Sequence, residues 1–521
     1  MKKSKNTLIY LIISSLFIGS FVSCTGDYDE INTDKSKVQK IGPAELPFLF
    51  TRAIAAVPFF NDQVAQNLYS DLYAQYFANL VAYFPTDRYV MEMDWIDSPW
   101  SNIYTGVVPQ LQAVFENTDP SSPENAIAHI WWVYAFHKLT DYFGPIPYFQ
   151  AGVPGISVAY DSQEAIYADF FVQLNDAVAI LKNNTDKQPY GNYDIVYNGD
   201  VEKWIKFANS LRLRLALRLS KVDPAKAKSE AEQAVASGVF TKSPDDDALR
   251  QHNNNDPNRM SSMTTYDEFR MSAAMESVLK GFDDPRMPEY FLPAKTTGTY
   301  EGARNGYNPI EVAIPQNLIA ANSHVGPRWT RPDDGGLASY LTTPSIVMCA
   351  AEVYFLRAEG AYYGWNMGAG VTVKELYEEG IKNSMIQFGI DDAAAIQAYI
   401  NNTNKPIPPQ DYLNSPALLD VPVLFSTVSE IQLQQIALQK WLALFPDGWE
   451  AWSDYRRLKA FDLYPVVNSD HPDIPDPTTQ AIRRLVYPLA EKETNGGELT
   501  KGITLLGGEN KITTPLWWDK N

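Results

Sequence analysis

The side chains that most often do chemistry in proteins are scarce in this 521-residue chain, which has five histidines and two cysteines. A helix that holds a metal ion presents two histidines about three or four positions apart, whereas the nearest two here, His129 and His137, are eight apart. No glycine-rich phosphate loop, nucleophile elbow or zinc-binding helix occurs in the sequence. We therefore predict a protein that is not an enzyme and that has no catalytic residues, metal or cofactor.

One enzymatic alternative stays open, a glycoside hydrolase at the cell surface. Such an enzyme needs two carboxyl groups roughly 5 to 9.5 Å apart, and the 62 aspartates and glutamates of the chain do not exclude such a pair. Incubation of the purified protein with oligosaccharides would reveal this activity by its products.

Cys24 is the one reactive side chain with an informative context. Three lysines and then an apolar run, Leu8 to Val22, precede it, which is the order of a secretory signal. The run has 15 residues, fewer than the roughly 20 that an α-helix needs to cross a bilayer. The segment "FVSC" resembles a bacterial lipobox, in which the cysteine receives a diacylglyceryl group, and two acyl chains are what stable anchoring requires.

We therefore predict a signal peptide at residues 1–23, lipidation of Cys24, and a solvated tether at residues 24–45. The alternative for Cys24 is a disulfide with Cys349. That cysteine lies in the apolar run "SIVMCAAEVYFL", where a buried free thiol is common, so we disfavour the pairing.

Composition limits what the rest of the chain does. Hydrophobic residues make up 45% of the sequence, enough for a large core in one big domain or two, and the net charge is −19. Nucleic-acid binding needs a basic face, so we predict no nucleic-acid partner.

Apolar residues at helical spacing predict long helices. The first predicted helix has its apolar stripe at Val64, Leu68, Leu72, Tyr76 and Leu80. A second helix covers residues 126–143 and ends before Gly144 and Pro145. A third begins near residue 160, where Asp161 and Glu164 fit a capping box.

The segment 204–222 alternates leucine with arginine as a strand would, yet its longer pattern is helical. Trp204, Leu211 and Leu219 belong to one stripe over sixteen residues. We expect its three arginines to pair with carboxylates rather than to bind a polyanion; they are Arg212, Arg214 and Arg218.

Two further helix pairs are predicted at residues 345–365 with 373–388 and at 429–445 with 449–458. Consecutive pairs of this kind suggest tetratricopeptide-like packing. Between the helical blocks, residues about 243–343 are rich in turns and irregular. Because long irregular inserts in compact domains usually carry function, this capping region is where we first expect a ligand surface.

Seven motifs together resemble the SusD/RagB family of lipoproteins from the Bacteroidetes outer membrane, close to its SusD-like branch. They are the lipobox with "YDEINTD", "LTDYFGPIPYF", "YDSQEAIYADFFVQLNDAVAIL", "YNGDVEKWIKFANSLRLRLALR", "AAEVYFLRAEGAY", "IALQKWLALFPDGWEAWSDYRR" and "RRLVYPLAEKETNGG". They span nearly the whole mature chain in the order of the family.

The resemblance implies a mainly α fold over residues 46–521, built from tetratricopeptide-like helix pairs with an irregular cap. It also implies binding rather than bond breaking, with capture of oligosaccharide, or in some members peptide, for a SusC-like TonB-dependent transporter. The acids after Cys24 are similar to surface-export signals of such lipoproteins. We therefore expect a lipid-anchored protein exposed at the outer membrane.

The ligand site is predicted from the chemistry of sugars, which have apolar faces for aromatic rings and hydroxyls for polar side chains. Two loop stretches combine aromatic, arginine and aspartate residues, and we expect them to converge. The candidates are Tyr83, Asp87, Arg88, Tyr89 and Trp95 in the first stretch and Arg328, Trp329, Arg331 and Asp333 in the second.

The lipid-anchor prediction is tested by Cys24→Ala, with Cys349→Ala as a control that leaves the lipobox intact. We expect the Cys24 variant to lack lipid and to be lost from the outer-membrane fraction, because no acyl chains then hold it there. Retention of Cys24→Ala in that fraction would contradict the prediction.

Overall fold

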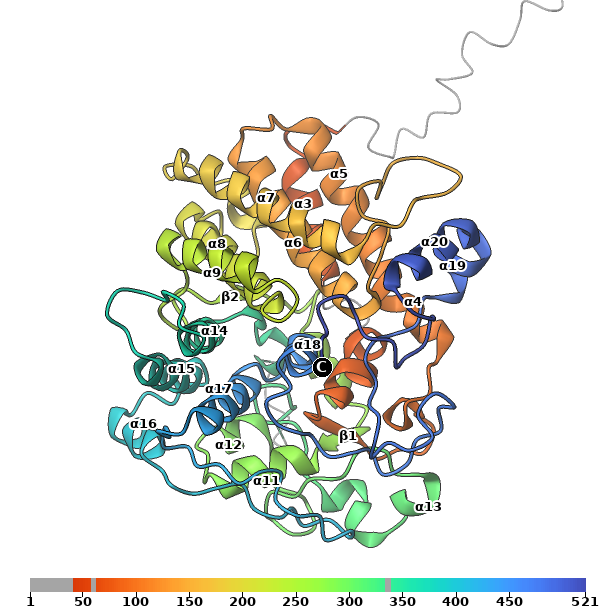
Figure 1. Ribbon diagram of the computed structural model, residues 1–521, viewed down its shortest axis with the longest axis vertical. Helices are drawn as coiled ribbons and strands as arrows, with labels where there is room; N and C mark the ends of the chain where they lie inside the picture. The colour runs from red at the N-terminus through yellow and green to blue at the C-terminus, as the bar shows by residue number, and fades with distance from the viewer. Residues whose placement is uncertain (1–40, 58–61, 333–338) are drawn as a thin grey trace, which may run out of the picture. The chain divides into compact units, whose positions relative to one another are not determined.

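The computed structural model describes residues 41–57, 62–332 and 339–521. Contacts between residues divide the chain into two units, Met1–Glu45 and Leu46–Asn521. In the first unit the described residues form a turn in which the backbone N–H of Glu45 donates to the Gly42 carbonyl at 3.1 Å. Cys24 lies outside the described residues. The second unit is mainly α-helical, as predicted (Figure 1).

The first block of the second unit mixes short elements of several kinds. These are α3 (Leu46–Ala56), the π-helix η1 (Gln63–Asp71), β1 (Phe77–Asn79), the 3-10 turn η2 (Thr86–Arg88), α4 (Met93–Ser101), the π-helix η3 (Asn102–Val107) and α5 (Val108–Asn117).

Four pairs of successive helices form the scaffold of the described residues, and the two helices of each pair contact each other. They are α6 (Pro123–Phe143) with α7 (Gln163–Lys182), α8 (Val201–Arg218) with α9 (Pro224–Ser237), α14 (Ala350–Tyr362) with α15 (Val373–Gln387), and α17 (Ser429–Ala443) with α18 (Gly448–Leu458). The predicted tetratricopeptide-like pairing is confirmed.

Local sequence explains where the central helix α6 begins and ends. The Ser122 hydroxyl accepts from the Asn125 N–H at 3.2 Å, so it caps the first turn. The helix ends at Gly144, whose φ of +88° suits glycine, and Pro145 follows. Almost every residue of α6 is buried, which is typical of a helix that is packed on all sides.

The helical interpretation of residues 204–222 is also confirmed, because most of this segment lies in α8. The side chains of Trp204, Leu211 and Leu215 are buried. The leucine–arginine alternation does not produce a strand because neighbouring helices bury both residue types, the leucines by packing and the arginines by pairing.

Three local predictions were wrong. The helix predicted from residue 345 begins only at Ala350, because Ser345–Met348 form the strand β4. The helix predicted from Val64 to Leu80 stops early, since residues 77–79 form β1, paired with a strand from the cap. The N-cap of α7 is Ser162 rather than Asp161. The carboxylate of Asp161 instead accepts from the N–H groups of Tyr148 and Phe149 at 3.0 and 2.9 Å.

The capping region is built from short elements, in keeping with its turn-rich sequence. They are β2 (Ala248–Arg250), α10 (Arg259–Thr264), β3 (Phe269–Met271), α11 (Ala273–Gly281), α12 (Met287–Tyr290), α13 (Pro309–Val312), the 3-10 turns η5 (Pro315–Asn317), η6 (Ile319–Ala321) and η7 (Ser339–Thr342), and β4 (Ser345–Met348). Strands β1 and β3 pair antiparallel, as do β2 and β4.

The chain is completed by one further 3-10 turn and three helices outside the pairs. They are η4 (Gly191–Tyr193), α16 (Ala393–Ile400), α19 (Leu489–Thr494) and α20 (Gly496–Leu506). In Figure 1 the blue helices α19 and α20 lie beside the orange helix α4, so the end of the chain returns to its first block.

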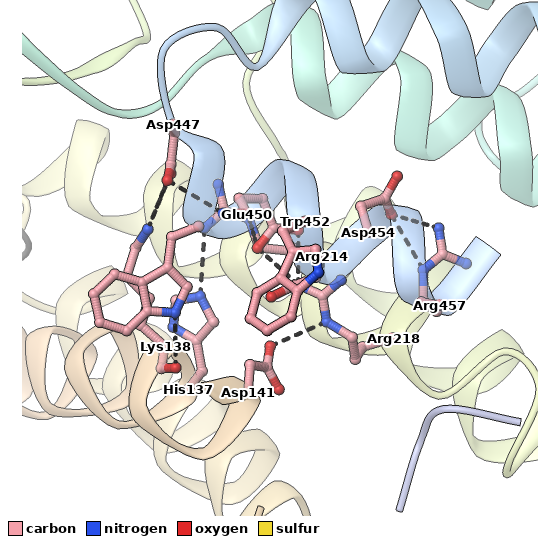
Figure 2. A network of polar contacts seen from close by, with 12 residues as sticks. His137, Lys138, Asp141, Arg214, Arg218, Asp447, Glu450, Trp452, Asp454 and Arg457 are labelled. Carbon is pink, nitrogen blue, oxygen red and sulfur yellow. Dashed lines mark hydrogen bonds and ion pairs between the residues drawn. The ribbon is translucent and has the colours of Figure 1, made fainter. Parts of the chain in front are cut away.

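The arginines of α8 pair with carboxylates, as predicted. The pairs are Arg212 with Glu230 at 2.5 Å, Arg214 with Glu352 at 2.6 Å, and Arg218 with Glu450 at 2.7 Å and Asp141 at 3.1 Å. Figure 2 shows Arg214 and Arg218 reaching toward carboxylates from other helices. We call these two arginines and the carboxylates they contact the ion network; it joins α6, α8, α14 and α18.

Burial and charge oppose each other at Arg218. Burial lowers the pKa of its guanidinium, but the carboxylates of Glu450 and Asp141 outweigh that effect, so the pKa lies above its usual value. The arginine therefore stays charged in the folded protein at any pH near neutrality.

We expect Arg218→Met to lower the free energy of unfolding by about 3–5 kcal/mol, because it leaves buried carboxylates without their partner. Lys374→Met, which breaks the exposed pair between Lys374 and Glu378, should cost less than about 1 kcal/mol. Urea denaturation measures both. Equal, small losses in the two variants would contradict the role given to the ion network.

Candidate functional site

The two predicted ligand stretches contact opposite ends of one short segment of the cap, Thr264 to Glu268. The first stretch follows β1, and the hydroxyl of Tyr83 donates to the Glu268 carboxylate at 2.5 Å. In the second stretch the carbonyl of Trp329 accepts from the Thr264 hydroxyl at 2.8 Å. The pairing of β1 with β3, which begins at Phe269, positions this segment.

Three aromatic side chains of the first stretch form a cluster with open ring surface. Tyr83 is 65% exposed, and Phe84 and Trp95 are half-buried. The ring centroids of Tyr83 and Phe84 are 4.6 Å apart, those of Phe84 and Trp95 are 5.6 Å apart, and both pairs meet edge to face. We call Tyr83, Phe84 and Trp95 the aromatic surface.

Polar groups border the aromatic surface. The amide of Gln63 donates to the second carboxylate oxygen of Glu268 at 2.7 Å, so Glu268 links Gln63 to Tyr83. The hydrogen bond that Tyr83 itself donates to Glu268 is the main reason that the pKa of the Tyr83 hydroxyl is raised. Rings beside such hydrogen-bonding groups match the two faces of a sugar.

Asp87 and Arg88 fix the loop that contains Tyr83 through buried polar contacts. The Asp87 carboxylate accepts from the Asn79 N–H at 3.1 Å and from the Asn305 amide at 2.8 Å, and burial raises its pKa to about 6. Arg88 pairs with Asp470 at 2.6 Å. Both predicted ligand residues are buried, so their positions support a structural role in fixing the loop.

Tyr89 lies at a cavity that the other predicted residues of its stretch do not line. Its φ of +66° lies in the left-handed region, and its side chain is buried. The ring packs edge-on against Tyr73, with centroids 5.9 Å apart, and lines a cavity of about 570 Å³.

The second stretch is mostly packed against the protein. Trp329 is 3% exposed, and its ring lies 5.7 Å from Phe445 between centroids. This burial argues against the predicted stacking of Trp329 on a ligand, because apolar packing already covers the ring. Arg328 lies over the Phe388 ring at 4.9 Å.

Of the two remaining candidates, the structure describes Arg331 but not Asp333. Arg331 is exposed, and Asp333 lies outside the described residues. The ligand-binding roles of all the candidates stay predictions.

Sequence reasoning passed over Phe84, Gln63 and Glu268. Phe84 was inside the quoted stretch, and its aromatic type was the available signal. Glu268 lies almost two hundred positions away in "TTYDEF", and the pairing that brings it to Tyr83 involves strands of only three residues. Tyr266, two positions before Glu268, is exposed as well.

The described residues contain no cluster of three or more histidine, cysteine, aspartate or glutamate side chains that could hold a metal ion. Burial raises the pKa of Asp62 to about 7, but with Asp71 and Asp447 it lines a cavity of only about 40 Å³. That volume holds a few water molecules.

Within the parts of the chain that the structure describes, no helix is both long and apolar enough to cross a membrane.

Together, the paired helices and the loop-rich cap define a mainly α-helical protein with a tetratricopeptide-like scaffold. Residues 30–519 match the SusD-like family, described as SusD and RagB outer membrane lipoproteins. The chain belongs to this family.

Solved structures agree with this assignment. A chitin-binding SusD homologue from Flavobacterium johnsoniae is 34% identical, with 92% of this chain and 99% of that chain covered and a TM-score of 0.81. A SusD homologue from Bacteroides thetaiotaomicron is 29% identical, with 91% and 99% covered and a TM-score of 0.80. Another chitin-binding protein is 27% identical, with 91% and 100% covered and a TM-score of 0.75.

A search of curated proteins finds no match. Family membership associates the protein with the outer membrane.

Proposed function

We propose that this protein is a surface lipoprotein that captures oligosaccharides of the chitin type and delivers them to a SusC-like TonB-dependent transporter. The observation that carries the proposal is the aromatic surface, bordered by Glu268 and Gln63, on a fold shared with a chitin-binding homologue.

The chemistry of the aromatic surface suits an N-acetylated sugar chain. The sugar's C–H faces stack on Trp95 and Tyr83, while Glu268 accepts hydrogen bonds from hydroxyls or amide N–H groups. Because the surface is open, successive sugar units can extend beyond it, which an oligosaccharide requires.

The expected affinity is modest. Each ring contributes about 0.5–1.5 kcal/mol if sugar stacking resembles aromatic pairing, and each hydrogen bond contributes a similar net amount. About four to eight such contacts give roughly 4–8 kcal/mol, or a Kd between millimolar and micromolar. That range allows capture followed by release to a transporter.

The proposed lipid anchor is the reason for proposing a transporter as partner. A protein that Cys24 holds at the membrane surface can concentrate a ligand but gives it no route inward. A partner that forms a pore must therefore complete the uptake, and the SusC-like class is the partner that the family resemblance implies.

We expect Trp95→Ala and Tyr83→Ala each to weaken chitohexaose binding at least about fivefold, because each removes a stacking surface worth about 1 kcal/mol. Tyr193→Ala is the matched control, since Tyr193 is also exposed and its ring lies 4.6 Å from Phe48, the distance that separates Tyr83 from Phe84. Calorimetry measures the three variants and the wild type. Unchanged affinity in both test variants would place the ligand elsewhere.

We also expect a tagged copy, purified from its native membrane in mild detergent, to bring with it a β-barrel protein of the size of the large multistranded transporters, about a hundred kilodaltons. Mass spectrometry identifies the partner. Recovery of the lipoprotein alone from membranes in which it is abundant would count against delivery to a transporter.

A further inference from the structure

Glu268, at the border of the aromatic surface, is a carboxylate without a cationic partner. One of its oxygens accepts from the Tyr83 hydroxyl at 2.5 Å and the other from the Gln63 amide at 2.7 Å. Both donors are neutral, and no lysine, arginine or histidine of the described residues forms an ion pair with Glu268. The side chain is only half-buried. Because a carboxylate has about four lone-pair sites, Glu268 can accept further hydrogen bonds from a ligand.

The chain around Glu268 does not supply the missing positive charge. Residues 81–97, which carry the rings of the aromatic surface, include four carboxylates and one cation. That cation, Arg88, is buried and paired with Asp470. In the cap segment, Asp267 pairs with Arg270, whose side chain is 2% exposed. The two segments that form the aromatic surface and its border are therefore acidic.

An open aromatic ring distinguishes Glu268 from a similar carboxylate elsewhere. Tyr83 is 65% exposed, and the hydroxyl at the edge of its ring contacts Glu268. A sugar stacked on this ring has its substituents near the carboxylate. Glu491 is also half-buried and accepts from the Tyr160 hydroxyl at 2.7 Å and the Asn495 amide at 3.2 Å. Tyr160, however, is 6% exposed, so its ring offers a ligand almost no surface.

An open ring beside an uncompensated carboxylate suits an ammonium group. The face of an aromatic ring attracts cations, and a hydrogen bond between an ammonium group and a carboxylate is roughly twice as strong as one between neutral groups. An ammonium group also has three N–H donors, whereas an N-acetyl amide has one. A neutral sugar therefore leaves the charge of Glu268 unused.

We propose that the aromatic surface selects the free amine of a glucosamine unit, so that among sugars of the chitin type it prefers chains that lack some of their acetyl groups. This inference rests on the proposed function for the place where the sugar lies, and it adds the chemical group that the site selects. The sugar ring lies on the ring of Tyr83, and its ammonium group binds Glu268. N-acetylated units of the same chain bind by stacking and by neutral hydrogen bonds.

The test compares chitohexaose with hexaglucosamine, the same chain without its acetyl groups. At about pH 5.5 the amines of hexaglucosamine are protonated, because aliphatic amines lose their proton only well above this pH. We expect calorimetry to show that hexaglucosamine binds at least about fivefold more tightly than chitohexaose. Equal affinities, or tighter binding of chitohexaose, would overturn the inference.

Two glutamine substitutions separate the site from a general attraction of a cationic chain to an acidic protein. Glu268→Gln removes the proposed partner of the amine, whereas Glu491→Gln removes the same charge from a carboxylate with similar contacts and no open ring. Glu268→Gln should lower the ratio of the two affinities at least about fivefold, and Glu491→Gln should preserve it. A structural role of Glu268 would weaken both sugars alike, so an unchanged ratio in folded Glu268→Gln would overturn the inference.

The inference and the proposed function fail in different ways. Equal binding of the two hexasaccharides, with weaker chitohexaose binding in Trp95→Ala and Tyr83→Ala, would leave the proposed function standing and overturn the inference. Chitohexaose binding that neither alanine variant weakens would contradict the proposed function. A preference for hexaglucosamine that is lost in Glu268→Gln would still support the selection of an amine at this surface.

Discussion

Buried charge is the constraint on which the rest of this structure depends. Arg214 and Arg218 lie on a helix whose surroundings exclude water, and an unpaired ion there would cost several kcal/mol. Each guanidinium is satisfied only when α6, α14 and α18 present Asp141, Glu352 and Glu450 at hydrogen-bond distance. The helix pairs are therefore fixed in one mutual arrangement, since a shift by a turn would leave charges without partners.

A scaffold fixed in this way leaves the loops free to carry function. The cap segment that ends in Glu268 and the loop that contains Tyr83 both project from rigid elements, and internal contacts such as those of Asp87 hold them in place. Rigid supports of this kind reduce the entropy that binding costs.

The helical scaffold could be predicted because its signals are local. Periodicity and caps located α6 and α8, and the acidic composition indicated that the arginines of α8 would find carboxylates. The site could be predicted only in part. Tyr83 and Trp95 were recognisable as candidates by their residue type. Asp87 and Trp329 are buried, and their burial could not be predicted because it depends on contacts distant in sequence, such as that between Trp329 and Phe445. The pairing of β1 with β3 brings Glu268 to Tyr83, and these strands of three residues are too short to show the alternating pattern that predicts a strand.

We propose that the aromatic surface and its neighbouring cap segment bind oligosaccharide while the helical scaffold stays rigid. Hydrogen exchange with and without chitohexaose tests it directly, because a bound ligand suppresses local opening where it contacts the chain. We expect slower exchange at residues 81–96 and 264–268 and no change in α8 and α18. Unchanged exchange in both loop segments, with new protection elsewhere in the chain, would contradict it.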